Sequence, residues 1–427
     1  MALLPERFSA WVMGNLWHRG QVLGWLAVAA LLGHCSPAQA QIGGRWAYDL
    51  ILNNSPIPRV TALGGRVVSQ VENDPGLALY NPAMLSDSMN RRLFVTYTNS
   101  YGGISYGHAG YAHSVKRIGN FHGGITFAGA GQIDRRDATG AQQGTYSAND
   151  LALIAGYSRE FGPFRAGANV KLVYSNLEAY HSVGMAFDFG AGYFSQKLDL
   201  GAGITLRNAG FQFKTYTGNG RQEPLPLELL VGITKGIPRT PFRFGLTFQQ
   251  LNRPGILTNN PNLAPVRDLN GNLVKPKISV TDQVFAHMIF QLEVLIGRLR
   301  NVQVRFAYNH LRRKEFGVTN GGISLAGFSF GLGIRIKMFY LDYGFQAGNM
   351  VGNVHQVGLS CYLNKFGKNY KPPTSPRPMP QSITRERPAD VAPAPATPTT
   401  PTTPTNPVPQ APAPAPTPEP QPTPGNN

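Results

Sequence analysis

A two-residue alternation of apolar and polar side chains, repeated from Arg92 to Phe366, is the feature that most constrains this chain. In the clearest segment the apolar residues are Phe328, Phe330, Leu332, Ile334 and Ile336, and the residues between them are Ser329, Gly331, Gly333, Arg335 and Lys337. Successive side chains of a β-strand point to opposite faces, so such a segment predicts a strand with one apolar and one polar face. The alternation recurs at 165–172, 197–207, 242–248 and 302–308. The chain is therefore predicted to be all-β over most of its length.

The charges on the polar face indicate which side of the sheet can meet lipid. An Arg or Lys on a lipid face costs about 2–4 kcal/mol at the middle of the bilayer, so the face with Arg335 and Lys337 must look into a polar interior. A soluble barrel would have the reverse register and would have to hold the many aromatic side chains inside. The mean hydropathy of −0.18 fits a membrane barrel, because apolar and polar residues average out along each strand. We therefore predict a transmembrane β-barrel whose register is strongly fixed.

Short and long connections alternate between the predicted strands. The strand cores are predicted at 92–100, 104–113, 118–128, 151–160, 164–175, 181–194, 197–208, 226–236, 240–251, 284–295, 299–311, 321–336, 339–347 and 352–366. Short turns follow the even-numbered strands, whereas long connections follow many odd-numbered ones, at 129–150, 209–225, 252–283 and 312–320. This arrangement is typical of an antiparallel up-and-down barrel in the outer membrane, with long outer loops and both termini in the periplasm. The sequence predicts about fourteen transmembrane strands within residues 91–366.

Residues 1–40 have the pattern of a cleaved export signal. Positively charged residues precede a short apolar run at 22–33, and Ala38-Gln39-Ala40 is a small-x-small cleavage site. The apolar run is shorter than the roughly 20 residues that a spanning helix needs. A lipoprotein anchored at Cys35 is the alternative, which the bulky residue before this cysteine disfavours. Cleavage after Ala40 would leave Cys361 as the one remaining cysteine, so no intramolecular disulfide is expected.

Two segments flank the predicted barrel. Residues 41–90 precede its first strand, and a segment of this length is expected to fill the lumen as a plug. Residues 367–427 are dominated by Pro, Thr, Ala and Gln, a composition that cannot bury enough apolar surface to offset the entropy of ordering. We expect this tail to be disordered in the periplasm. It would act as a spacer or, in a sharper alternative, contact the cell wall or a periplasmic partner.

The net charge of +17 raises the possibility of nucleic-acid binding. The basic residues are instead spread singly along the strands, without a cluster or a recognition motif, and no nucleic-acid partner is expected. We interpret them as interfacial charges near lipid phosphates and as lumen-facing charges. The lumen-facing candidates are Arg165, Lys171, Arg243, Arg305 and Arg335. They could form an anion-selecting ladder, or a network that fills a closed lumen, which is the preferred interpretation.

Motifs that could carry enzyme chemistry are weak. Gly103-Ile104-Ser105-Tyr106-Gly107 fits the serine-hydrolase elbow, as does the segment 327–331, but both lie within predicted strands, whereas the elbow needs a strand-to-helix turn. A surface hydrolase would pair Ser105 with His108 or His113. The sequence contains no S-x-x-K, K-T-G or H-E-x-x-H motif, and we predict no enzyme activity, metal or cofactor.

The segment from Arg59 to Leu85 carries the most specific motifs: Ala62-Leu63-Gly64-Gly65, Asn73-Asp74-Pro75, and Asn81-Pro82 followed by Ala83-Met84-Leu85. Gly64-Gly65 permits a tight turn, and Asn73-Asp74-Pro75 has the form of a cap that starts a short helix. This stretch resembles the N-terminal signature of FadL-like outer-membrane barrels, and most closely that of the PorV/PorQ branch. The run Gln41-Ile42-Gly43-Gly44 with Tyr48 is more similar to the PorQ family, and the resemblance extends to about Phe366.

The resemblance to the PorQ family implies a non-enzymatic component of the type IX secretion system of Bacteroidota. In that family the barrel belongs to a surface attachment complex with PorU, PorV and PorZ. It tethers PorZ, while the sortase PorU removes the cargo's C-terminal signal and attaches the cargo to lipopolysaccharide. The Pro-rich tail departs from the family pattern. For this chain the resemblance implies an anchoring protein whose outer loops 129–150, 209–225 and 252–283 hold a PorZ-like partner.

The alternative function is that of a FadL-type transporter of hydrophobic small molecules. Such a protein needs an apolar pocket in the lumen and a lateral opening in the wall. The polar residues predicted to face inward make that pocket unfavourable; they are Arg165, Asn169, Lys171, Gln303 and Arg305.

Overall fold

The computed structural model describes residues 46–137, 139–218, 222–257, 266–267, 273–274, 279–297, 300–316, 324–348 and 352–363. The predicted signal segment 1–40, the predicted tail 367–427 and most of the predicted outer loop 252–283 lie outside these residues.

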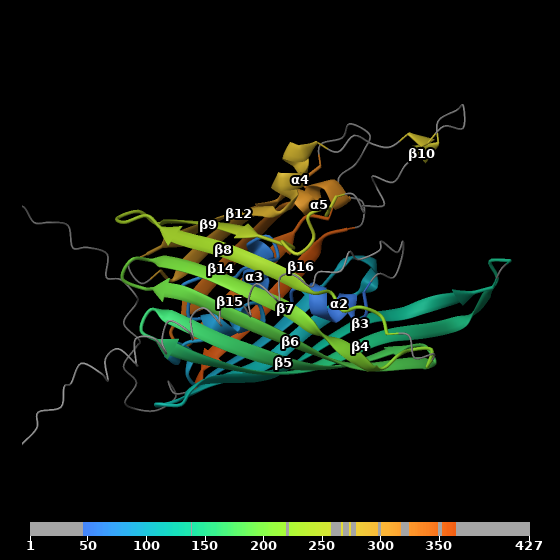
Figure 1. The fold of residues 1–427 in the computed structure, drawn as a ribbon, viewed down its shortest axis with the longest axis horizontal. Helices are drawn as coiled ribbons and strands as arrows, with labels where there is room; N and C mark the ends of the chain where they lie inside the picture. The colour runs from blue at the N-terminus through green and yellow to red at the C-terminus, as the bar shows by residue number, and fades with distance from the viewer. Residues whose placement is uncertain are drawn as a thin grey trace, which may run out of the picture. The chain divides into compact units, whose positions relative to one another are not determined.

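Fourteen antiparallel strands close into a single barrel (Figure 1). They are β1 (Arg92–Asn99), β2 (Ser105–Val115), β3 (Gly119–Arg136), β4 (Gln142–Phe161), β5 (Phe164–Leu177), β6 (Tyr180–Ser195), β7 (Leu200–Lys214), β8 (Glu228–Gly236), β9 (Phe242–Phe248), β12 (Met288–Ile296), β13 (Val302–Asn309), β14 (Phe328–Ile336), β15 (Phe339–Gln346) and β16 (Val354–Tyr362). Each barrel strand pairs with the next one along the chain, and β1 closes the circle on β16. The predicted fold class and the predicted number of strands are confirmed.

The register turns apolar side chains outward along every strand. In β1, Leu93, Val95 and Tyr97 are exposed, while the residues between them are buried. In β14, Phe328 and Leu332 are exposed, and the intervening serine and glycines are buried. Soluble proteins rarely expose continuous apolar surface of this extent, so the outside of the barrel has the chemistry of a surface that meets hydrocarbon.

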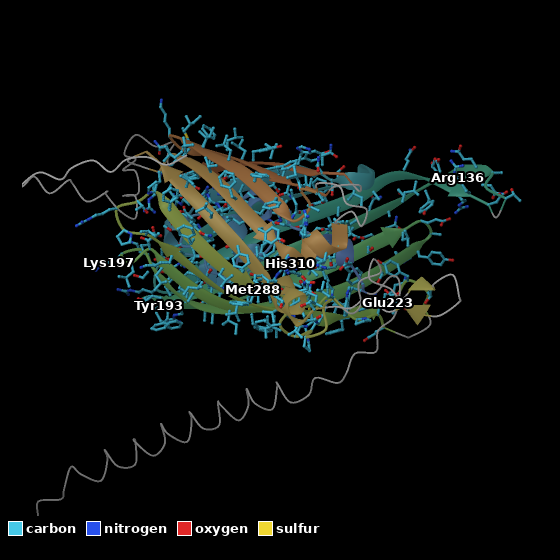
Figure 2. All side chains as sticks on the ribbon, turned by 90° about the horizontal axis from the view of Figure 1, so that it is seen from above. Arg136, Tyr193, Lys197, Glu223, Met288 and His310 are labelled. Carbon is cyan, nitrogen blue, oxygen red and sulfur yellow. The ribbon has the colours of Figure 1, made fainter. Side chains whose placement is uncertain are left out.

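Short turns gather at one end of the barrel and longer connections at the other. We call these the short-turn end and the long-loop end. Figure 2 shows Lys197, in the turn between β6 and β7, at the opposite end from Arg136, at the tip of β3.

The predicted outer loop 129–150 is wrong, because most of it is strand. β3 continues to Arg136 and β4 begins at Gln142. Pairing with β2 ends at Gly129 and pairing with β5 begins at Ala148, so residues 130–147 form a two-stranded ribbon beyond the barrel rim. Both faces of this ribbon are largely exposed. With water on both sides there is no apolar face, and the alternation that reveals the other strands is missing.

Smaller corrections concern the other connections. β7 continues to Lys214, into the predicted loop 209–225. The predicted strand at 284–295 begins inside a helix, α4 (Val280–Ala286), and a second helix, α5 (His310–Phe316), follows β13. Two short strands outside the barrel, β10 (Val266–Arg267) and β11 (Leu273–Val274), pair with each other. Of the connecting segments, η4 (Tyr101–Gly103) joins β1 to β2.

The segment before β1 lies inside the barrel, where Figure 1 shows its helices in blue. Its elements are α2 (Asp49–Asn53), α3 (Pro58–Ala62), η1 (Pro75–Leu79), η2 (Pro82–Met84) and η3 (Asp87–Met89). We call residues 46–91 the plug. Many of its apolar side chains, such as Val60, Leu63 and Leu77, are completely buried. Among the described residues, no helix is both long and apolar enough to cross a bilayer.

Proline and short polar side chains set the helix starts of the plug. η1 begins at Pro75, and the Asp74 carboxylate accepts a hydrogen bond from the Gly76 backbone N–H at 3.0 Å. η2 begins at Pro82 in the same way, with the Asn81 side chain as its cap. Proline suits the first helical position because its missing N–H would have no helical partner there. The cap expected at Asp74 is therefore present.

Candidate functional site: the plugged lumen

Side chains from the barrel wall donate hydrogen bonds to backbone carbonyls of the plug. They come from β5, β7, β12, β13 and β16, on all sides of the lumen. The donor and acceptor residues are Asn169 to Ala78, Arg207 to Leu52, Gln291 to Leu63 and Arg66, Asn309 to Gly64, and Gln356 to Ser55. The short helices of the plug leave many carbonyls without a partner, and a buried carbonyl without one is costly. Side chains of the wall therefore supply hydrogen-bond donors to plug carbonyls that the short helices leave without a partner.

Glycines on the inner face let the plug backbone touch the wall. A Cβ on Gly203 would lie 2.0 Å from the Val68 carbonyl oxygen, and one on Gly201 would lie 1.9 Å from that of Ser69. No side chain fits at such distances. Glycine on the polar face of the strands is therefore a packing requirement of the filled lumen.

The motif Ala62-Leu63-Gly64-Gly65 ends α3 at such a contact. Gly64 and Gly65 have φ values of +84° and +89°, which favour glycine and turn the chain sharply. A Cβ on Gly64 would lie 2.5 Å from the side chain of Ile289 on β12. This motif therefore combines a tight turn with close packing against the wall.

An ion-pair network joins the plug to β9, β12, β13 and β15. At its centre, Glu293 is within 3.3 Å of Arg305 Nε and 2.9 Å of Arg243 Nη1. Arg305 also binds Asp342 at 2.8 Å. Each side chain is almost completely buried, and a buried charge is tolerated only when opposite charges and hydrogen bonds surround it.

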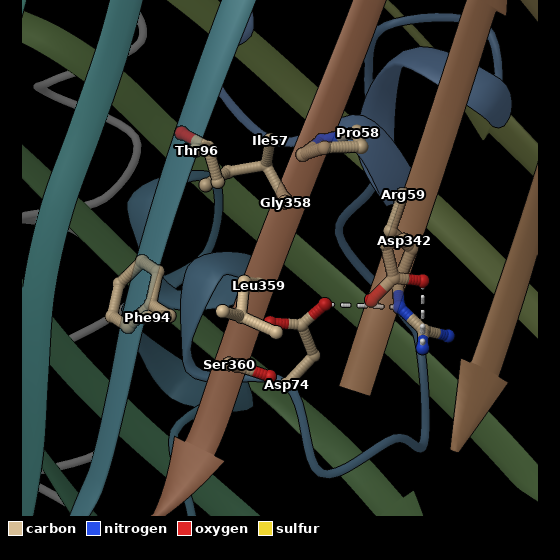
Figure 3. A pocket seen from close by; sticks show the side chains of 10 residues that line it. All are labelled: Ile57, Pro58, Arg59, Asp74, Phe94, Thr96, Asp342, Gly358, Leu359 and Ser360. Carbon is tan, nitrogen blue, oxygen red and sulfur yellow. Dashed lines mark hydrogen bonds and ion pairs between the residues drawn. The ribbon is translucent and has the colours of Figure 1, made fainter. Parts of the chain in front are cut away.

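The plug contributes both signs of charge to this network. Arg59 binds Asp74 at 3.0 Å and lies 3.9 Å from Asp342 (Figure 3). Glu72 binds Arg243 at 2.5 Å. Burial raises the pKa of the Glu72 carboxyl, but Arg243 and Arg59 outweigh that effect and lower it. Plug and wall are therefore charge-complementary at this point.

A second ionic contact joins the plug to β7 and β8, which come next to β9 around the barrel. Glu228, at the start of β8, accepts from Arg66 Nε at 2.9 Å and from Arg207 Nη1 at 3.0 Å. The Arg207 guanidinium also lies 4.3 Å from the ring centre of Tyr80 in the plug, a cation–π contact. One wall carboxylate thus holds one plug arginine and one wall arginine.

The five basic residues proposed to face the lumen all lie on inward-facing positions of their strands. Lys171, Arg243 and Arg305 are buried, and carboxylates bind all three. Arg165 lies 3.7 Å from Glu160, and Arg335 lies over the ring of Tyr340 at 5.2 Å. They do not line an anion path: each makes an ionic or cation–π contact, and Arg243 also binds Glu72 of the plug.

Sequence reasoning missed the acidic partners. Asp188, Glu293 and Asp342 sit at inward positions of their strands and pair with these bases, while Glu228, also inward, pairs with Arg207. The apolar–polar alternation of the sequence could have revealed these acidic residues. A lone carboxylate between two outward apolar residues, such as Glu293 between Leu292 and Val294, must face inward.

A small cavity remains beside Arg59, between the plug and the wall (Figure 3). Its volume of about 20 Å³ holds roughly one water molecule. Arg59, Asp74 and Asp342 line one side, and apolar residues such as Ile57 and Phe94 line the other. A drug-sized ligand needs a pocket of about 300 Å³ or more, so this cavity does not hold a hydrophobic substrate.

The wall is least regular between β7 and β8. Their ladder ends at the pair Arg207–Glu228, although β7 continues for seven more residues, to Lys214. Asn208 has a φ of +57° and forms a bulge there, and its side chain donates to the Pro226 carbonyl at 3.2 Å. Side-chain bonds therefore replace the backbone ladder above this point.

The candidate hydrolase residues do not form a site. In β2, His108 is buried on the inward side, whereas Ser105 has the opposite parity and points outward. His113 shares the outward side but lies eight residues away, about 27 Å along a strand. Across the part of the chain that the structure describes, no group of three or more His, Cys, Asp and Glu side chains is arranged to hold a metal ion.

No protein-family model and no curated protein matches this chain. Among solved structures, it is similar to a deletion mutant of the TodX monoaromatic hydrocarbon channel, with 11% identity, coverage of 73% of this chain and 98% of that chain, and a TM-score of 0.41. It is also similar to a FadL homologue from Pseudomonas aeruginosa, with 10% identity over 76% of this chain and 100% of that chain and a TM-score of 0.37. The KdgM porin gives 8% identity over 63% and 98%, with a TM-score of 0.28.

Proposed function

We propose that this chain is an outer-membrane barrel that anchors a partner protein at the cell surface and does not conduct solutes. The observation that carries the proposal is the attachment of the plug to the wall on all sides, through side-chain bonds to its carbonyls and two buried ionic contacts. A channel lined by mobile or water-filled space would not need so many bonds between plug and wall. The bonding favours a permanent structural filling.

The long-loop end is the side that we assign to the cell surface, with the short-turn end in the periplasm. Membrane barrels of this class have short periplasmic turns and longer outer connections. The ribbon at 130–147 and the helices α4 and α5 then face outward. An ordered ribbon that extends past the rim supplies a rigid surface for a protein partner.

The partner class follows from the resemblance of the plug motifs to the PorQ family. We propose a PorZ-like surface protein, within an attachment complex of a type IX secretion system that includes PorU and PorV. The ribbon is the preferred contact, since its two strands pair only with each other above Gly129 and Ala148 in the described part of the chain. Apart from the Ser147 carbonyl, which accepts from the Glu178 N–H, their outer backbone groups are available to a partner.

Transport of hydrophobic small molecules is the second candidate. The end of the β7–β8 ladder at Arg207–Glu228 favours it, because a wall without continuous backbone pairing opens more easily than a complete one. The packing of the lumen opposes it, because apolar side chains of the plug already cover the inward apolar residues of the wall, such as Phe94, Ile154 and Phe194.

The test combines a pull-down with a conductance measurement on the same protein. The full chain is purified in detergent from its native membrane, beside a variant whose ribbon, residues 131–147, is replaced by a two-residue Asn-Gly turn. Anchoring predicts a surface protein that co-purifies with the full chain and not with the variant, and no steady conductance in planar bilayers. A co-purified fatty acid or hydrocarbon without a protein partner would support transport. A stable open channel would contradict the structural role of the plug.

A further inference from the structure

One surface of α4 is apolar and has no partner among the described residues. Val280 is 80% exposed and Val284, one helical turn later, is 54% exposed. The opposite side is occupied: Asp282 binds His310 and Lys314 of α5, each at 3.1 Å, and Ala286 is completely buried. The helix is therefore amphipathic, with its polar side satisfied and its apolar side facing away from the protein.

This apolar surface is continuous with the lipid-facing surface of the barrel. The ring centre of Phe285 in α4 lies 6.2 Å from that of Phe290, which is an outward residue of β12. Phe285 and Phe290 are each 39% exposed, and so is Leu251, three residues past the end of β9. The exposed apolar side chains thus run from the wall onto the helix without a polar break at this contact.

Two of the three strands next to α4 are too short to cover a bilayer. A spanning strand has about 9–11 residues, whereas β9 has seven and β13 has eight; β12, between them, has nine. Seven residues at about 3.4 Å each and a tilt near 45° rise roughly 17 Å, compared with an apolar band of about 25 Å. The deficit of about 8 Å is close to the 10 Å diameter of one helix.

α4 lies at the height where the wall falls short. It ends at Ala286, two residues before β12 begins at Met288. Figure 2 shows Met288 and His310 partway along the barrel, between Lys197 at the short-turn end and Arg136 at the tip of the ribbon. The helix therefore flanks the rim of the short strands and does not project as far as the ribbon does.

We propose that α4 lies in the interfacial layer of the outer leaflet, with Val280, Val284 and Phe285 against lipid acyl chains, and that it completes the apolar band above the short strands β9 and β13, on either side of β12. Asp282 pairs with Lys314 and His310 on the side of α4 opposite Val280 and Val284, and the ring of Phe285 lies between, with its centre 6.0 Å from that of His310. This assignment concerns contact with lipid and does not depend on which protein the barrel anchors.

Depth-dependent fluorescence quenching tests the proposal. The natural tryptophans, Trp11, Trp17, Trp25 and Trp46, are replaced by phenylalanine in the full chain. Single tryptophans are then placed at Val284, at Phe290 as a control within the apolar band, and at Thr145 as a control on the exposed ribbon. Each variant is refolded into phosphatidylcholine vesicles whose acyl chains carry bromine at a shallow or a deep position.

We expect shallow bromine to quench V284W at least twofold more than deep bromine does, and deep bromine to quench F290W more strongly. T145W should respond to aqueous iodide and not to either lipid. The proposal is overturned if V284W behaves like T145W. It is equally overturned if V284W is shielded from both iodide and brominated lipid, because a protein surface then covers the helix. Should V284W fail to fold, F285W keeps an aromatic ring at the adjacent position and gives the same discrimination.

Discussion

Replacing Glu228 by glutamine tests whether the plug is held by charge. Glutamine keeps the shape of the side chain and one acceptor oxygen, but removes the negative charge that faces Arg66 and Arg207. Breaking a buried ion pair by neutralising one partner costs about 3–5 kcal/mol. Since the remaining oxygen still accepts a hydrogen bond, we expect the lower end of that range. A loss of about 3 kcal/mol increases the population of the released plug roughly a hundredfold.

Trp46 makes the plug observable in this experiment. It lies at the first described residue of the plug, and the Arg253 guanidinium stacks over its ring at 4.0 Å. In a chain whose other three tryptophans are phenylalanine, urea titration of Trp46 fluorescence follows the plug, while circular dichroism follows the strands. We expect E228Q to lower the urea midpoint of the fluorescence transition and to leave the circular dichroism transition nearly unchanged. Planar-bilayer recordings should show brief openings that the parent protein lacks.

The matched control is Asp134→Asn in the ribbon. It removes the same charge from an exposed pair with Arg136 at 3.3 Å, and exposed pairs contribute little to stability. The reasoning is refuted if E228Q and D134N give the same fluorescence midpoint. The two ionic contacts would then be incidental to plug retention, and the anchoring of the plug would have to rest on its backbone bonds.

Three further predictions concern the inner face, the outer face and the loops. Gly203→Ala places a Cβ 2.0 Å from the Val68 carbonyl oxygen, so we expect the plug to become accessible to added protease in the folded barrel. Ile204→Arg, on the outer side of the same strand, should cost about 2–4 kcal/mol if it lies near the bilayer centre, measured as a lower folded yield in vesicles. The hydrogen bond from Lys314 lowers the pKa of Asp282 below its ordinary value of 3.8, so the contact between α4 and α5 should persist above that pH and weaken as the pH falls below it, measured by hydrogen exchange of α4.

Each of these has a direct control. Ile204→Ala should fold normally in vesicles and should not increase protease access. Asp282→Asn should abolish the pH dependence of hydrogen exchange in α4. A pH dependence that survives this substitution would assign the transition to another group.

The wall of the barrel was predictable because two different environments act on alternate residues. The hydrocarbon outside favours apolar side chains, whereas the filled lumen inside favours glycine and polar or charged side chains. The residues of β14 alternate between these two kinds. The ribbon at 130–147 was not predictable in this way, since water surrounds both of its faces. Nor were α4 and α5 predicted, because seven residues each are too few for a clear helical period.

The candidate site was predictable only in part. The inward positions of Arg243 and Arg305 followed from strand parity, but their partners come from other strands and from the plug. Glu72 and Arg243 are 171 residues apart along the chain, and no local pattern encodes that pairing. Arg59 and Arg66 lie within the motif region, but nothing in the sequence distinguishes them from surface arginines.

The seam between β1 and β16 has a consequence for how the molecule is made. Arg92 pairs with Tyr362, so the circle stays open until the last strand is in place. The plug precedes in the chain every strand that surrounds it, and its carboxylates and guanidiniums must remain hydrated until the barrel closes. When the barrel closes around the plug, both partners of each ion pair lose their bound water at nearly the same time.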